Sequence, residues 1–356
     1  MAYGRENGHF AKPTSKPCSQ KPCKVTHFFG KFVGFAAFCY FCTSLYSFFP
    51  LEQFTINILG CGCATPTVRH NPSAQLIVIH GKQFLMDCGE GIQKELLRQR
   101  ISLSRLTAIF ISHLHGDHIF GLPGLISTLA LTGRTADLHI YGHADLEQML
   151  RPWLDYFCRG MAFSVIFHSV DCSQKTVVYS DRSVTVYSLP LRHRVPATGY
   201  LFEEATPLPH IRRDMIDAIG IPHHAINSIK HGEGWHADDG TYYPHEHLTT
   251  PARPARSYAY VSDTCYLPRL AEQVKGVTLL YHEATYVNAD AFWAKKYGHS
   301  TAGDAANIAK AAGAGGLVIG HFSARYRDES VLLREAQEIF PLTTLAKESK
   351  RFEVGV

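Results

Sequence analysis

One short stretch decides how this chain is interpreted: Ile111-Ser-His-Leu-His-Gly-Asp-His118. It overlaps the end of an apolar run, Ala108–Ile111, which predicts a buried strand with the polar side chains on the loop that follows. That loop offers four ligand-type side chains: His113, His115, Asp117 and His118. Imidazoles and a carboxylate at this spacing can serve two metal ions roughly 3.5–4 Å apart. The alternative, a histidine-rich surface turn, is disfavoured because the strand directly before the loop is apolar.

Two ions need more ligands than one loop supplies, and three further candidates each lie just past an apolar run. His193 follows Ser183–Leu189, Asp263 follows Tyr258–Val261, and His321 follows Leu317–Ile319. Taken singly, each histidine could equally be a buried core residue and the aspartate a turn residue, rather than a metal ligand. Their shared position past a strand predicts that they converge with the His113–His118 loop at one edge of the sheets.

The remaining pattern predicts a layered α/β fold. Short β-rich runs come first, and helical stretches follow and alternate with further strands. The predicted strands include Phe54–Leu59, Gln75–Ile79 and Gln83–Met86, and the predicted helices include Ile92–Arg100 and Ala302–Ala312. Mixed sheets covered by helices are therefore expected.

Composition excludes a wholly disordered or fibrous protein, since 46% of the 356 residues are hydrophobic and 19% are charged. The net charge is +4, but residues 1–50 hold six Lys/Arg against one acid, so they contribute +5 and the rest sums to −1. Global charge thus gives no argument for a nucleic-acid partner. The ten cysteines are too irregularly placed for a disulfide scaffold and favour a reducing compartment.

Residues 1–50 differ from the rest and are treated as a leader separate from a domain over 51–356. A polar, Lys/Pro/Cys-rich stretch precedes an aromatic run over 28–49, of which residues 32–49 carry no charge, the minimum length for a membrane span. We favour a dispensable or wrongly started leader, for which disorder is one expectation. Membrane association through 28–49 and an interaction helix are the alternatives. The Cys39–Cys42 pair has CxxC spacing, but without a second pair it is a weak metal or redox signal.

Residues 207–250 form a second unusual segment, rich in Pro, Gly, His and Asp. Apart from a helical run over Arg213–Ala218, little apolar periodicity is visible there. A stretch of this length inside a compact domain is expected to be an exposed excursion with a function or an ill-packed loop.

These motifs resemble the metallo-β-lactamase superfamily over about residues 54–345. The resemblance rests on the HxHxDH loop, on Asp87 in Met86-Asp-Cys-Gly-Glu, and on the later single His, Asp and His. It implies a four-layer αβ/βα sandwich. Three further motifs resemble one branch, the short ribonuclease Z enzymes: His282-Glu-Ala-Thr285, His299-Ser-Thr301 and Gly320-His-Phe-Ser-Ala-Arg-Tyr326. That branch trims the 3′ ends of tRNA precursors, leaving a 3′-hydroxyl on the tRNA and a 5′-phosphate on the trailer.

The resemblance also implies roles for single residues and two Zn²⁺ per subunit. His113, His115 and His193 would hold one ion, Asp117, His118 and His321 the other, and Asp263 would bridge them. Asp117 would also accept a proton from water, and His299 would protonate the leaving 3′ oxygen, ordered by Glu283. Asp87 would support the ligand loop from outside the first coordination sphere.

Substrate recognition is implied at the 207–250 insertion, which matches in position the family's tRNA-binding arm. The substrate-binding candidates are Arg212, Arg213 and Lys230 on the arm, and Arg325 near the metals. The arm departs from the family pattern because six acids outnumber these three cations. The Thr65–Asn71 loop resembles the family loop that monitors the CCA end, but lacks its Lys and shifts its Arg. A homodimer in the cytoplasm is implied, and no motif indicates an obligate protein partner.

Two other classes of function compete with this interpretation. Another dinuclear hydrolase of the superfamily, such as a phosphodiesterase or an arylsulfatase-like enzyme, would share every metal ligand but would not need the 207–250 insertion. A metal-free scaffold or RNA-binding subunit is disfavoured, because all seven ligand positions are filled.

Overall fold

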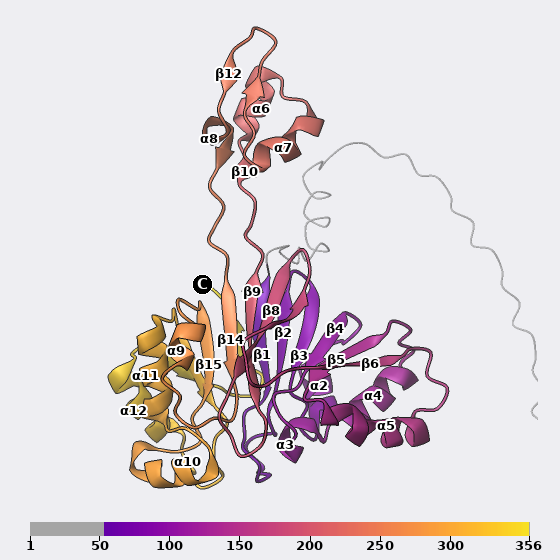
Figure 1. Cartoon of the computed structure of the whole chain (residues 1–356), viewed down its shortest axis with the longest axis vertical. Helices are drawn as coiled ribbons and strands as arrows, with labels where there is room; N and C mark the ends of the chain where they lie inside the picture. Colours follow the sequence, from indigo (N-terminus) through magenta and orange to yellow (C-terminus); the bar gives the residue numbers. More distant parts are fainter. Residues whose placement is uncertain (1–52, 356) are drawn as a thin grey trace, which may run out of the picture. The chain divides into compact units, whose positions relative to one another are not determined.

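The structure is a computed structural model that describes residues 53–355. Two seven-stranded sheets lie face to face, with helices on their outer sides (Figure 1). The first sheet has the order β18-β1-β2-β3-β4-β5-β6. Its strands are β1 (Phe54–Gly60), β2 (Ala74–Ile79), β3 (Lys82–Met86), β4 (Leu106–Phe110), β5 (Leu138–Gly142), β6 (Val165–Ser169) and β18 (Arg351–Glu353).

The second sheet has the order β17-β16-β15-β14-β9-β8-β7. Its strands are β7 (Val177–Ser180), β8 (Val184–Pro190), β9 (Thr198–Glu204), β14 (Ser257–Val261), β15 (Leu279–Glu283), β16 (Leu317–Gly320) and β17 (Thr343–Leu345). β14, β15, β16 and β17 run parallel, as do β3, β4, β5 and β6. The carboxyl ends of the parallel strands within each sheet therefore share an edge.

Alternation along the strands of the first sheet explains the layering. Phe84 and Met86 of β3 join the core that includes the facing strands of the second sheet, whereas Leu85 packs on the other side with the helices. Side chains of successive strand residues point to opposite faces of the sheet. A strand that is buried on both faces therefore has a continuous apolar sequence. The predicted four-layer α/β/β/α sandwich is confirmed.

Helices α2 (Ile92–Arg98), α4 (Leu122–Leu131) and α5 (Asp145–Phe157) cover the first sheet, while α9 (Leu270–Gln273), α11 (Ala302–Ala312) and α12 (Ser330–Ile339) cover the second (Figure 1). Shorter elements are α3 (Gly116–Ile119), η2 (Asn288–Asp290) and α10 (Ala291–Tyr297). The start of α11 is fixed by a capping box between Thr301 and Asp304, and Gly313 ends the helix at φ +63°.

The 207–250 segment is more ordered than its composition predicts. It contains β10 (His210–Ile211), α6 (Arg213–Ile219), η1 (His223–Ala225), α7 (Ile226–Lys230), β11 (Trp235–His236), β12 (Tyr242–Tyr243), α8 (His245–Leu248) and β13 (Thr249–Thr250). Four buried side chains, Ile221, Ala225, Ile229 and Leu248, form a small core of its own. We call residues 207–250 the arm. Of the two alternatives, an exposed excursion or an ill-packed loop, the second was wrong, because elements this short show no periodicity even when they share a core.

The predictions for residues 1–50, including the leader, the membrane alternative over 28–49 and the CxxC pair, lie outside the described residues. Between residues 53 and 355, no helix combines the length and the apolar character that a membrane span requires.

Candidate metal centre

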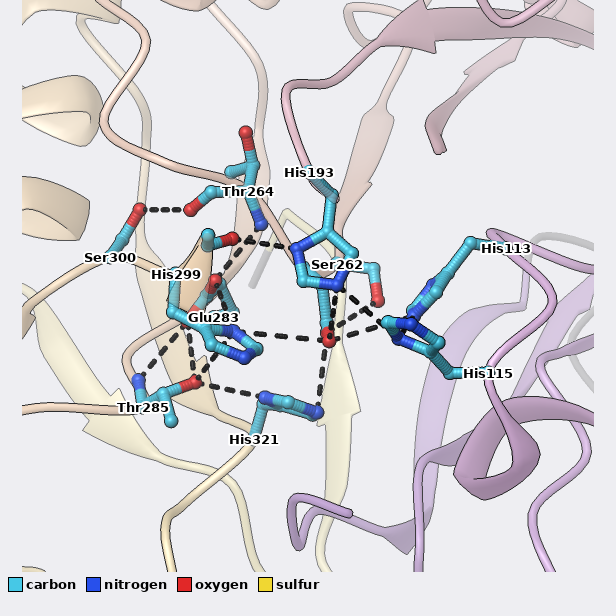
Figure 2. Close-up of polar contacts among 12 residues, drawn as sticks. His113, His115, His193, Ser262, Thr264, Glu283, Thr285, His299, Ser300 and His321 are labelled. Atoms are coloured by element: carbon cyan, nitrogen blue, oxygen red, sulfur yellow. Dashed lines mark hydrogen bonds and ion pairs between the residues drawn. The ribbon is translucent and has the colours of Figure 1, made fainter. Parts of the chain in front are cut away.

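The ligand-type residues gather where strands of both sheets end. β4 leads into His113, β14 into Asp263 and β16 into His321, while His193 lies on the turn between β8 and β9. α3 then returns Asp117 and His118 toward His113. Figure 2 shows His113 and His115 facing His193 across the gap between the two halves of the fold. The structure therefore brings together all seven residues that the sequence predicted as ligands.

Three histidines and one carboxylate form the first group. His115 Nδ1 lies 3.0 Å from His113 Nε2 and 3.3 Å from His193 Nε2. Asp263 Oδ2 lies 3.6 Å and 3.9 Å from the Nε2 atoms of His113 and His193. These donor atoms all lie within 4.8 Å of one another, a separation that suits ligands of a single ion.

The second group contains Asp117, His118 and His321. Asp117 Oδ2 lies 3.3 Å from His118 Nε2 and 3.6 Å from His321 Nε2. The other carboxylate oxygen of Asp263, Oδ1, lies 3.6 Å and 3.2 Å from those same two nitrogens. Asp263 thus presents one oxygen to each group, the arrangement of a bridging ligand.

Two observations test whether these residues fit metal ions. His118 Nε2 and His321 Nε2 are buried and form no hydrogen bond with any described residue, although both nitrogens face carboxylates. Burying such an atom without a partner is costly, and a bound cation would satisfy it. In addition, burial lowers the pKa of His113, His115 and His193, so these imidazoles stay neutral and keep a lone pair. The residues therefore fit a site for metal ions.

Charge in the site is balanced between carboxylates and imidazoles. Burial alone would raise the pKa of Asp117, but the charges of His118 and His321 outweigh burial and lower it. The same opposition holds for Asp263, where the charges of His321 and His118 outweigh burial and lower the pKa. Both carboxylates stay ionised at neutral pH, which metal binding requires.

Asp87 supports the ligand loop from behind. Its Oδ2 accepts hydrogen bonds from His118 Nδ1 at 2.7 Å, from Ser112 Oγ at 2.9 Å and from the Tyr260 hydroxyl at 2.8 Å, and its Oδ1 accepts one from the Ser112 N–H at 2.7 Å. Because His118 donates from Nδ1, its Nε2 is left for a ligand role. This is the supporting position that the resemblance implied for Asp87.

Glu283 organises the opposite side of the site, as Figure 2 shows. Its Oε1 accepts from His299 Nδ1 at 3.0 Å and from the Thr264 N–H at 2.9 Å, and its Oε2 accepts from the Thr285 hydroxyl at 2.6 Å. Burial lowers the pKa of His299, but the charges of Glu283 and Asp263 outweigh burial and raise that pKa to about 9. His299 therefore carries a proton at neutral pH.

Sequence reasoning gave no separate role to several residues that support the site. Thr285 accepts a hydrogen bond from His321 Nδ1 at 2.9 Å, and the Gly298 carbonyl accepts one from His193 Nδ1 at 2.7 Å. Ser112, Tyr260 and Thr264 also hold site residues in place. Thr285 lies in the quoted His282–Thr285 motif, which was the available signal for it; a lone tyrosine or serine gives none.

The predicted substrate-binding cations lie in two different places. Arg213 is exposed on the arm, whereas Arg212 and Lys230 are half-buried there, and Arg212 pairs with Asp214 at 2.7 Å. Arg325 instead follows β16, where its Nη1 lies 3.4 Å from Asp290 Oδ2. The structure therefore does not bring the four cations together.

The Thr65–Asn71 loop is tied to the C-terminal part of the chain. Arg69 donates to the carbonyls of Tyr326 and Arg327 and pairs with Glu329 at 2.6 Å. His70 Nδ1 lies 3.0 Å from Glu348 Oε2, and this hydrogen bond raises the pKa of His70. Arg69, the arginine whose position departs from the family pattern, is therefore engaged in contacts within the chain.

The two facing mixed sheets and the His/Asp cluster at their ends define a metallo-β-lactamase-fold protein. A solved metallo-β-lactamase-fold protein of this class, YhfI from Bacillus subtilis, superposes with a TM-score of 0.60 at 21% identity, covering 85% of this chain and all of that one. The family model for the anti-Pycsar protein Apyc1 matches residues 54–197 and so ends before Asp263.

More specific matches come from one branch. Ribonuclease Z of Phocaeicola vulgatus is 50% identical over 304 residues, which are 85% of this chain and 98% of the relative. The crystal structure of human tRNase Z, short form, gives a TM-score of 0.62 at 25% identity, covering 85% of this chain and all of that one. The chain belongs to the ribonuclease Z family of hydrolytic endoribonucleases.

Proposed function

We propose that this chain is a zinc-dependent endoribonuclease that removes the 3′ trailer from tRNA precursors, leaving a 3′-hydroxyl on the tRNA and a 5′-phosphate on the trailer. The observation that carries the proposal is Asp263, whose two oxygens each face a separate group of ligand-type residues. Relatives named ribonuclease Z support RNA as the substrate, and the human neighbour named tRNase Z supports tRNA.

In this proposal His113, His115 and His193 would hold one Zn²⁺, Asp117, His118 and His321 would hold the second, and Asp263 would offer one oxygen to each. Nitrogen and oxygen donors without a thiolate suit zinc in a hydrolytic site. When bound, two divalent ions supply Lewis-acid chemistry: they lower the pKa of a water molecule and offset negative charge on phosphate oxygens.

The chain's own residues then handle the protons. Asp117 accepts the proton of the attacking water as the water oxygen bonds to phosphorus. The bond from phosphorus to the ribose 3′ oxygen breaks, and His299 donates its proton to that oxygen because an alkoxide is a poor leaving group. Glu283, hydrogen-bonded to His299 Nδ1, fixes the orientation of the ring. The atoms balance to a 3′-hydroxyl and a 5′-phosphate.

Recognition of the tRNA body falls to the arm through Arg212, Arg213 and Lys230, and Arg325 contacts the RNA near the metals. We further propose that the protein acts as a homodimer in the cytoplasm. The cysteines that the structure describes are all free, as in proteins of reducing compartments. Residues 51–356 form the nuclease domain, with the arm inserted between β9 and β14.

One experiment tests the function directly. The purified chain is incubated with a trailer-bearing tRNA precursor and, in parallel, with bis-p-nitrophenyl phosphate, and bound zinc is measured by elemental analysis. We expect about two zinc ions per chain, loss of both activities on chelation, and a trailer with a 5′-phosphate. Asp117→Ala serves as the inactive variant, and Glu147→Ala on α5 as the matched carboxylate control.

The results separate this proposal from another dinuclear hydrolase of the same fold. Such an enzyme would hydrolyse the small diester and leave the precursor intact, and that outcome would overturn the assigned substrate. Absence of bound zinc in an otherwise active protein would overturn the assigned metal.

A further inference from the structure

Aromatic and basic side chains gather on α10 and on the segments packed against it. We call this group the α10 patch and define it as Tyr286, Phe292, Trp293, Lys296, Tyr297 and Arg325. Only Arg325 has a role in the function proposed above. The residue that follows α10 by two positions is His299, whose N–H donates to the carbonyl of Ala294 at 2.8 Å. The helix is therefore attached directly to the metal centre.

Ring contacts run continuously from His299 to the surface. The Tyr286 ring lies 6.1 Å from the His299 ring, and the Arg325 guanidinium lies 5.6 Å from the Tyr286 ring and 5.8 Å from the Trp293 ring. Trp293 stacks on Tyr297 at 5.9 Å with an angle of 11°, and Lys296 Nζ lies 4.9 Å from the Trp293 ring. One row of side chains thus leads outward from the proposed proton donor.

The outer part of the row is open to solvent. Phe292 is 71% exposed, and its ring meets the edge of Trp293 at 5.2 Å and 77°. Lys296 and Arg325 are also exposed. The rings beneath the cations are less open, since Trp293 and Tyr297 are half-buried and Tyr286 is buried. Because Lys296 and Arg325 are themselves exposed, their contacts with the Trp293 ring are worth only about 0.5–1 kcal/mol, so a flat ligand can displace them. The exposed Phe292 ring and the rings beside it form an apolar surface on which flat ligands can stack.

The charge around α10 favours an anionic ligand. Lys295, Lys296 and Arg325 stand against Asp290, which is itself in contact with Arg325 at 3.4 Å and accepts from the Tyr326 hydroxyl at 2.5 Å. Lys295 and Arg192 line a hollow that reaches His299, together with one acid, Asp304. Cations of the α10 patch therefore outnumber the acids on its outer surface, and the hollow beside His299 carries two cations and one acid.

We propose that the α10 patch binds unpaired nucleotides next to the scissile phosphate, with its rings stacking on bases and its cations contacting the backbone. Rings with interleaved cations are how proteins bind single-stranded nucleic acid without sequence preference. Paired bases cannot offer their faces, so the patch selects the unpaired junction between the acceptor stem and the trailer. This inference rests on the proposed function, since it supplies the part of the substrate that the arm does not reach.

The test measures binding and cleavage in the full chain. The double variant Phe292→Ala/Trp293→Ala removes the outer rings, and Trp153→Ala, an exposed tryptophan on α5, is the matched control. Binding of a short unstructured fluorescein-labelled RNA is followed by anisotropy. We expect roughly five- to hundredfold weaker binding for the double variant and unchanged binding for the control. Lys296→Ala should reduce the salt dependence of binding.

Abasic substrates locate the contact. Precursors with a single abasic position near the cleavage site should be cleaved more slowly than the intact precursor by the parent chain, and no more slowly by the double variant. Hydrolysis of bis-p-nitrophenyl phosphate and the melting temperature should not change in that variant. Equal RNA affinity and equal abasic sensitivity with and without the rings would overturn the α10 patch while leaving the nuclease assignment intact. Failure of the parent chain to cleave any precursor, with ring-dependent RNA binding retained, would instead overturn the nuclease assignment.

Discussion

Two residues of the metal centre, Asp87 and His321, have φ angles of +52° and +61°, a conformation that side chains other than glycine rarely adopt. Such strain persists only where surrounding contacts impose it. Asp87 accepts bonds from Ser112, Tyr260 and His118, and His321 donates to Thr285. These bonds fix the directions in which the two imidazole Nε2 atoms point. The strained backbone therefore contributes to the orientation of these imidazole side chains.

His299→Ala should slow precursor cleavage strongly and leave the zinc content unchanged. The reason is that His299 lies beside Asp263, with its Nδ1 at 3.8 Å, but is bound by Glu283 and is assigned to the leaving oxygen rather than to a metal. Hydrolysis of bis-p-nitrophenyl phosphate should fall less, because p-nitrophenolate leaves without needing a proton. Single-turnover kinetics on both substrates, beside elemental analysis, measures the difference. His168→Ala, outside the metal centre, is the control, and loss of a zinc equivalent from His299→Ala would show that His299 is a ligand.

The residues that converge at the centre were predictable one by one, and the resemblance added Asp87 and Glu283, whereas the contacts of Ser112, Tyr260 and Thr264 were not predictable. His113–His118 is a local motif, and His193, Asp263 and His321 each follow an apolar run, so sequence position alone identified them. Tyr260 reaches Asp87 across 173 positions of the chain, and Ser112 reaches it across 25. Hydrogen bonds between such distant residues depend on how the two sheets pack together. The spacing of residues in the sequence gives no information about that packing.

At the scale of elements, one buried carboxylate joins the end of β9 to the base of the arm. Glu204 accepts from Arg253 at 2.6 and 2.7 Å, from Arg256 at 2.9 and 3.1 Å, and contacts His80 at 2.6 Å. Arg253 and Arg256 belong to the segment that returns from the arm. This junction therefore fixes both strands where the arm begins and ends.

Glu204→Gln should destabilise the protein by about 1–3 kcal/mol at neutral pH, because it removes the buried carboxylate that accepts charge-assisted hydrogen bonds from the half-buried guanidinium groups of Arg253 and Arg256. Burial raises the pKa of Glu204, but the hydrogen bonds from Arg253 and Arg256 outweigh burial and lower it. A lowered folded-state pKa contributes stability above the unfolded-state pKa, and that contribution is lost as the pH falls below it. Thermal unfolding from pH 2 to pH 8 should therefore show a constant difference between the parent and the variant above about pH 5, and convergence only as the pH falls below about 4. A constant difference across this range would contradict the assignment.

The elements of the sandwich were predicted closely, whereas in the arm only α6 was, as the helical run Arg213–Ala218. Ala302–Ala312 was predicted with the bounds of α11, and Phe54–Leu59 falls one residue short of β1. Long runs with both faces buried give a clear signal. Within the arm, the two-residue strands β10 and β11 and the short helix α7 give none, and their order depends on one shared core.

At the scale of the whole molecule, the arm and the metal centre lie at opposite ends of the same two strands. β9 starts after His193 and its turn and runs toward the arm, and β14 returns from the arm and ends before Asp263 (Figure 1). Seven residues of strand separate the two ends by roughly 20 Å. A tRNA bound to the arm must therefore span this distance or reach the metal centre of a second subunit.

Deleting residues 1–50 should leave precursor cleavage and solubility intact or improved. Every assigned ligand, support and substrate contact lies at or beyond Asp87, and both sheets are built from residues after 53. The check compares kcat/KM, melting temperature and size-exclusion behaviour of the truncated and full chains. A truncated chain that fails to fold, or a full chain that is extracted only by detergent, would make the leader structural or an anchor.

Replacing residues 209–247 with a short Gly/Ser linker should separate RNA recognition from chemistry. No assigned ligand lies in that stretch, the arm packs on its own core, and shortening the loop changes closure entropy by only about 1 kcal/mol. Both zinc ions and the hydrolysis of bis-p-nitrophenyl phosphate should be retained, while precursor affinity falls. The proposed dimer adds a sharper expectation, because one subunit's arm would serve the other's metals. A mixed dimer of arm-less and Asp117→Ala subunits would then pair an intact arm with an intact metal centre across the interface and recover part of the activity. Since the arm carries a net charge of −3 with histidines neutral, equal precursor affinity with and without it would show that recognition lies elsewhere.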